Sequence, residues 1–206
     1  FLVGTDAVGV LADGRDGGPA VVRARGPLAR LEALADLLDV LVPGDFEGLP
    51  AALDYELAPD RDVVDIYLSV RADADGLRSG LGVLQVFFQA NRMPVWAPAV
   101  GFGERDGPSP YFAFEDGRAT SWAWAAPSGR LSPLFAASGA DVFTSGRVVV
   151  AGCGEERIHL GRLALGGPGL PAVQGVLAEL AGAPRATVRG VVRRADGSPA
   201  PDARVH

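Results

Sequence analysis

Short runs in which apolar and polar residues alternate recur along most of this 206-residue chain, and they constrain its fold more than any other feature. The clearest runs are 52–57, 63–70 and 157–165. Alternation with a period of two is typical of a β-strand, because successive side chains point to opposite faces of a sheet. Glycine (28) and proline (16) are frequent between the runs, as expected of many tight turns. We predict a mainly β fold, an antiparallel β-sandwich or supersandwich with one or two short helices.

Two segments have the spacing of a helix instead. Residues 171–180 predict a short helix, with Pro171 in its first turn and Gly182 just after its end. Residues 28–42 are ambiguous: leucines recur there at helical spacing, but the apolar run before Pro43 also fits an edge strand. The patterns leave helix and strand equally open at 28–42.

Residues 111–124 predict a hairpin, because Asp116-Gly117 lies between two alternating runs and is a preferred pair for a two-residue turn. Such a turn would pair Glu115 with Arg118 and Phe114 with Ala119. In that register one face of the hairpin carries three aromatic side chains, Tyr111, Trp122 and Trp124.

These three residues are the candidate ligand-binding surface of the sequence. Tryptophan and tyrosine on an exposed sheet face can stack on sugar rings or hold a peptide. A hairpin buried on both faces would explain the same residues as core packing, so both interpretations stay open.

The net charge and the small number of cysteines and histidines exclude several classes of function. The net charge is −6, so the phosphate backbone of a nucleic acid would be repelled. The chain has no run of 18 apolar residues, and we therefore predict no membrane span. Cys153, His159 and His206 are its only cysteine and histidines, which is too few to predict a metal site. We predict no cofactor and assign no catalytic residue.

His159 is the remaining candidate for ligand binding. It stands between Ile158 and Leu160, so on a strand its ring should point to the polar face. We expect a solvated imidazole without partners. By the same alternation, at least two of Val64, Ile66 and Leu68 should be almost fully buried.

The end of the chain has a more specific pattern. The residues that carry it are Val188, Gly190, Val192, Asp196, Gly197, Pro199, Ala203 and Val205. This stretch resembles the start of a carboxypeptidase regulatory-like domain, a prealbumin-like sandwich. The resemblance implies that residues 186–206 contain the first strands of a second small β-sandwich, after the domain formed by residues 1–183. It also implies a location outside the cytoplasm, because such domains occur in secreted, periplasmic or surface-attached bacterial proteins.

The larger part is similar to regions that precede such a module in large bacterial proteins, some of which carry a PHP-type metal-dependent phosphoesterase domain. The similar stretches are 31–70, 94–102 and 148–180, and their layout resembles the supersandwich of the galactose-mutarotase-like class. The His/Asp cluster of a PHP domain is not in this sequence, so that chemistry cannot be transferred.

Together these observations predict a non-catalytic structural or binding module of a larger extracytoplasmic bacterial protein. We expect the sequence to be a piece of that protein. Its partners would be neighbouring domains of the same chain and a glycan or peptide. The alternative is an accessory part of a carbohydrate- or phosphoester-processing enzyme whose active site lies mostly outside this segment.

Overall fold

The fold is mainly antiparallel β with one described helix, as the alternation predicts. The computed structural model describes residues 2–3, 5–29, 48–72, 77–88, 95–98, 100–102, 108–115, 119–127, 130–137, 140–151, 154–184, 186, 189–201 and 203. Its strands are β1 (Leu2–Val3), β2 (Ala7–Asp13), β3 (Ala20–Ala29), β4 (Pro50–Leu57), β5 (Val63–Ala72), β6 (Leu77–Phe88), β7 (Val95–Ala97), β8 (Gly101–Phe102), β9 (Tyr111–Glu115), β10 (Ser121–Ala125), β11 (Ser132–Ala137), β12 (Ala140–Ala151) and β13 (Gly154–Gly166). The helix, α2, spans Leu170–Leu180 and confirms the helix predicted at 171–180.

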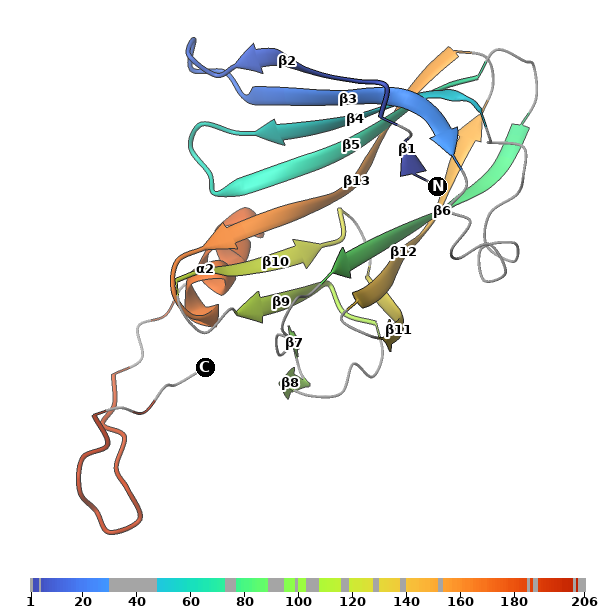
Figure 1. Ribbon diagram of the computed structural model, residues 1–206. Coiled ribbons are helices and arrows are strands. Elements are labelled where there is room, and N and C mark those ends of the chain that lie inside the picture. Colours follow the sequence, from blue (N-terminus) through green and yellow to red (C-terminus); the bar gives the residue numbers. More distant parts are fainter. Residues whose placement is uncertain are drawn as a thin grey trace.

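Ten of these strands form one large sheet in the order β1-β3-β4-β5-β13-β10-β9-β7-β8, with β2 also paired to β3 (Figure 1). The other three form a smaller sheet in the order β11-β12-β6. Strand β13 is the last of the described strands in the sequence, but it lies in the middle of the large sheet between β5 and β10. Two sheets and a helix agree with the predicted sandwich-like architecture.

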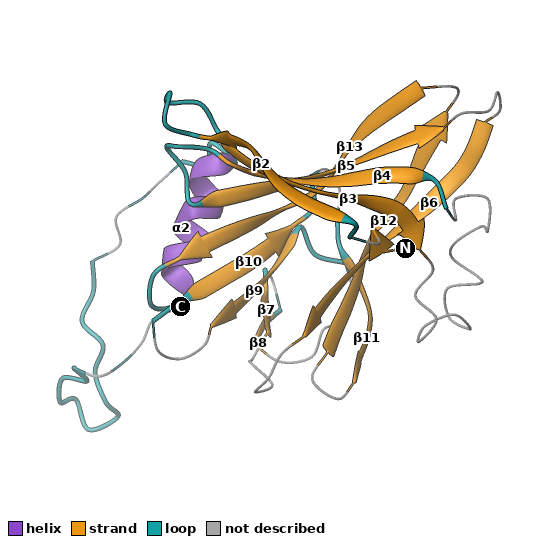
Figure 2. Ribbon diagram, turned by 45° about the horizontal axis from the view of Figure 1, so that its top comes forward, coloured by secondary structure: helices purple, strands orange, loops and turns teal. Residues whose placement is uncertain are grey.

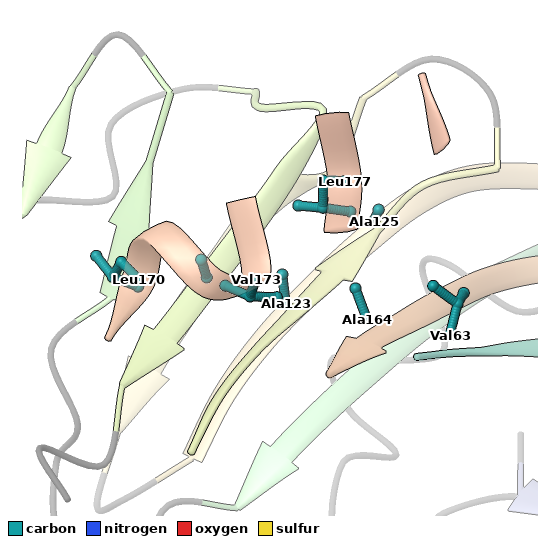
Figure 3. Close-up of a cluster of buried hydrophobic side chains, with 8 residues drawn as sticks. Val63, Ala123, Ala125, Ala164, Leu170, Val173 and Leu177 are labelled. Atoms are coloured by element: carbon teal, nitrogen blue, oxygen red, sulfur yellow. The ribbon is translucent and has the colours of Figure 1, made fainter. Parts of the chain in front are cut away.

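Helix α2 lies against β9, β10 and β13 on one side of the large sheet, which we call the helix-side face (Figure 2). Leu170, Val173 and Leu177 point from the helix toward the small side chains of the strands (Figure 3). Those strand residues are Val63, Ala113, Ala123, Ala125 and Ala164. Alanines let the helix backbone come close to the sheet, and the leucine and valine side chains fill the remaining space.

The other side of the large sheet, which we call the opposite face, holds two further apolar clusters. One contains Leu28, Leu68 and Val70. The second is built mainly from aromatic residues of β9 and β10 and also includes Val95, Ala97 and Leu131. The core therefore extends along both faces of the same sheet.

The hairpin of β9 and β10 exists, but its predicted register is wrong. Glu115 pairs with Ser121, so five residues connect the strands instead of two, and residues 116–118 lie outside the described part. Trp122 pairs with Phe114 and Trp124 pairs with Phe112. The shift is three residues, and an odd shift moves side chains to the other face. This register gathers the four large rings on one face and leaves alanines under the helix, so tertiary packing outweighs the turn preference of Asp-Gly.

The burial predicted for β5 is also wrong. Leu68 is 5% exposed, but Val64 and Ile66 are only partly buried, while Val63 is 2% exposed because helix α2 covers it. Val64 and Ile66 pair with residues of β4 that are themselves exposed, so this end of the opposite face stays open to solvent.

The ambiguous segment is only partly described. Residues 28 and 29 belong to β3, and residues 30–47 lie outside the described part. In the described part of the C-terminal tail, Arg193 and Pro199 form an isolated antiparallel bridge around a turn at Gly197. The tail extends away from the two sheets (Figure 1).

Candidate functional site

The aromatic residues of the hairpin lie in different environments. Trp124 is 4% exposed and belongs to the core, together with the fully buried rings of Phe112 and Phe114. Trp122 is half-buried, and its ring stacks on Phe114 with 4.0 Å between centroids. Tyr111 lies on the helix-side face, so the prediction that it shares a face with the two tryptophans is wrong.

Tyr111 is enclosed by other side chains. Its ring stacks on Trp96 at 5.9 Å, next to the cluster that helix α2 covers. Burial raises the pKa of the Tyr111 hydroxyl above its ordinary value of 10.0. The hydroxyl therefore stays protonated across the physiological range.

A second group of candidate side chains lies on the helix-side face, on strands beyond the helix. We call it the charged array: Arg23 on β3, Asp54 and Glu56 on β4, Asp65 and Tyr67 on β5, and Arg157, His159 and Arg162 on β13. The strand pairings place Arg23 beside Asp54, Asp54 beside Tyr67, and Tyr67 beside His159, so all lie on one face.

His159 lies on the polar side of β13, as the alternation predicts, but it has partners. Its Nε2 is 3.1 Å from the carbonyl oxygen of Gly161 and 2.7 Å from Asp65 Oδ1, although it is not aligned to hydrogen-bond that carboxylate. Because both neighbours are acceptors, Nε2 must carry a proton. Its ring stacks on Tyr67 at 4.6 Å, and its side chain is only 23% exposed. The prediction of a solvated imidazole without partners is therefore wrong.

Tyr67 also has a cation against its ring. The guanidinium carbon of Arg157 lies 3.7 Å from the centroid of the Tyr67 ring. Burial, and then the charge of Asp65, raise the pKa of Tyr67. With His159 and Arg157 both packed against it, the ring has less surface for stacking on a sugar.

The buried end of the array is a bidentate ion pair. Arg23 Nε and one terminal nitrogen each lie 2.5 Å from an oxygen of Asp54, whose side chain is 2% exposed. The hydrogen bond to Asp54 is the main reason that the pKa of Arg23 is raised. Arg157 hydrogen-bonds Glu56 and lies 3.8 Å from Asp54. The array thus includes a carboxylate that could not be buried without its arginine.

The charges of the array cancel. Three arginines face three carboxylates, and Arg162 Nε lies 3.2 Å from the same Asp65 oxygen that His159 approaches. Chemically, the His159–Asp65 contact places an imidazole beside a carboxylate, and the remaining groups neutralise one another. Of the array, the sequence put only His159 forward as a site residue. The acidic residues of 52–57 and 63–70 alternate onto the polar face, but no pattern within one strand shows which strand lies next to it.

Among the described residues, no three or more histidine, cysteine or acidic side chains gather as a metal ion would require. The helix in the described part of the chain is not long and apolar enough to cross a membrane. No protein-family model matches the chain, and neither does any curated protein.

Proposed function

We propose that this chain is a non-catalytic structural or binding module of a larger bacterial protein that lies outside the cytoplasm, next to further domains of the same chain. The observation that supports this best is the internal pairing of the charged array. Its arginines, carboxylates and histidine contact each other across four strands, and their charges cancel.

Catalysis by acid–base chemistry would need a base with access to a substrate and a second group to return the proton. In the array, the Nε2 of His159 lies beside the carbonyl oxygen of Gly161 and the carboxylate of Asp65. Arg157 and His159 pack against the tyrosine beside it. These contacts favour a role in holding neighbouring strands together.

If the module also binds a glycan or peptide, Trp122 is the candidate on its face of the hairpin that stays partly exposed, because Trp124 is in the core. The extracytoplasmic location rests on the resemblance of residues 186–206 to a carboxypeptidase regulatory-like domain.

The test combines turnover and binding on the whole chain. We expect no hydrolase or epimerase turnover on chromogenic glycosides, phosphoesters and free sugars. On glycan and peptide arrays, we expect any binding to be lost in Trp122→Ala and kept in Arg130→Ala, a substitution at an exposed residue. Turnover that disappears in His159→Ala but not in Arg130→Ala would refute the proposal.

One contact favours the alternative, an accessory part of a carbohydrate- or phosphoester-processing enzyme. A histidine beside a carboxylate is a common arrangement in acid–base catalysis, and His159 Nε2 lies 2.7 Å from Asp65 Oδ1. Under this alternative His159→Ala should reduce the activity of the larger protein while leaving the fold of this segment intact.

A further inference from the structure

The C-terminal tail, residues 184–206, differs in charge from the rest of the chain. It carries five arginines and two aspartates, whereas residues 1–183 carry 14 arginines and 23 acidic residues. Arg189, Arg193 and Arg194 are exposed, and the last two donate hydrogen bonds to carbonyl oxygens of the tail rather than to carboxylates. These two guanidinium groups keep their positive charge available to an acidic surface.

No apolar side chain is buried in the described part of the tail. Its backbone hydrogen bonds join tail residues to each other, for example Arg194 N to Ser198 O and Ala200 N to Val192 O. Val191 and Val192 are 71% and 44% exposed. An isolated two-stranded hairpin is only marginally stable in water, so a hairpin with exposed valines needs a further surface to pack on. The surface that fits this tail is apolar with an acidic rim.

A groove beside the end of helix α2 has this composition. A cavity of about 420 Å³, which we call the α2 groove, is lined by Asp60, Arg61, Asp62, Val176, Glu179 and Leu180. Val176 and Leu180 supply its apolar surface, and its three carboxylates outnumber its one arginine. The last turn of the helix has no basic residue, and the carbonyl end of a helix is itself negative, so the groove attracts cations.

We propose that the basic tail docks in the α2 groove of its own chain, with its valines on Val176 and Leu180 and its arginines beside the carboxylates. The tether favours this partner, because Leu180 lines the groove and the chain from there to Arg189 reaches roughly 30 Å when extended. A segment tethered this closely has a millimolar effective concentration, which a second copy in dilute solution does not match. The tail extends away from the sheets in Figure 1, so the docked arrangement exchanges with the extended one.

The docked arrangement should be sensitive to salt. Exposed ion pairs contribute little one at a time, so docking depends on several weak charge contacts together with the valines. At about 1 M salt the Debye length falls to ~3 Å, and the attraction between tail and groove is largely screened.

In the proposed larger protein, this contact would hold the second domain, which the tail begins, against the end of helix α2. That consequence rests on the proposed function, whereas the contact between tail and groove does not.

Carbodiimide cross-linking tests the contact directly, because the reagent joins an amine to a carboxylate only where the two touch. The chain has no lysine, so Arg193→Lys introduces the only side-chain amine and keeps the charge. We expect a link within one chain to Asp60, Asp62 or Glu179, located by mass spectrometry and reduced about threefold or more in 1 M salt. Arg130→Lys, at an exposed residue outside the tail, is the matched control and should give no link to these carboxylates.

Cleavage by trypsin gives the second measurement. Trypsin cuts after the arginines of the tail only while they are accessible, so docking should slow this cleavage. Removing two groove charges with Asp60→Asn and Asp62→Asn should speed it by about threefold or more, because the tail is then extended for more of the time. Asp6→Asn with Glu155→Gln, at two exposed acidic residues that do not line the groove, should leave it unchanged.

The proposal is refuted by cross-links that join two chains or reach only carboxylates outside the groove, or by tail cleavage that is equally fast in the groove variant and its control. Neither measurement uses turnover or ligand binding, so either outcome leaves the proposed function to its own test.

Discussion

Replacing Gly161 by alanine should destabilise the fold, mainly through a clash with the indole of Trp124. A Cβ at position 161 would lie 2.5 Å from Cζ2 and 2.9 Å from Cε2 of Trp124, and 3.0 Å from the carbonyl oxygen of Ala125. Ordinary van der Waals contact begins at 3.4 Å, so the indole would have to move by about 0.9 Å. Phe112, Phe114 and Leu131, all almost fully buried, belong to the same cluster and restrict that movement.

The expected cost of Gly161→Ala is about 1–3 kcal/mol, the usual range for adding a carbon to a packed core. Trp124→Leu removes both clashing ring atoms and should cost about 3–5 kcal/mol by itself, as large-to-small core substitutions do. In that background Gly161→Ala should cost much less, because only the 3.0 Å approach to the carbonyl oxygen of Ala125 remains. The two changes should therefore couple by about 1–3 kcal/mol.

Urea unfolding of the four chains, followed by circular dichroism, measures this coupling. Gly9→Ala is the control, since its Cβ meets nothing within 4 Å and it also lies in a strand. Its free energy of unfolding should stay within about 1 kcal/mol of the original chain. Strict additivity of Gly161→Ala and Trp124→Leu would show that the indole does not pack on Gly161.

Three further predictions concern Gly166, His159 and Tyr111. Gly166→Ala should cost about 1–3 kcal/mol in urea unfolding, because its Cβ would lie 2.5 Å from a backbone nitrogen of helix α2, whereas Gly167→Ala, with nothing within 4 Å, should be neutral. His159→Ala should cost about 1 kcal/mol, more than a free surface side chain, and His159→Phe should recover part of it by keeping the stack on Tyr67; equal losses would argue against the stack. Burial raises the pKa of Tyr111, so only the unfolded chain ionises this hydroxyl just above pH 10.0, and the free energy of unfolding should fall as pH rises through that value. Tyr111→Phe should flatten this dependence of the free energy of unfolding on pH, and an unchanged dependence would contradict the burial of Tyr111.

A strand or helix was predictable from the sequence where its own residues follow a regular apolar spacing. The alternation of 63–70 and 157–165 identifies β5 and β13, and Pro171 with the apolar spacing after it identifies α2. These patterns are local, because the alternation of a strand or the spacing of a helix repeats along the whole element.

The pairing of elements was not predictable in the same way. Nothing within 63–70 indicates that its neighbour in the sheet begins about ninety residues later, at Gly154. The charged array is assembled by that pairing, so the sequence put only its histidine forward as a site residue. At the hairpin a local preference for a two-residue turn was present, but packing four aromatic rings on one face decided the register.

The position of β13 in the large sheet has a consequence for synthesis on the ribosome. Strands β1 to β5 and strands β7 to β10 are complete by residue 125, but they are joined only through β13, which ends at Gly166. Until that strand has left the exit tunnel, β5 and β10 each keep an unpaired edge on the nascent chain. Such edges are the surfaces on which partly folded chains aggregate. The two halves of the sheet can therefore join only after Gly166 has emerged, and until then chaperones that bind exposed strands can act on both of them.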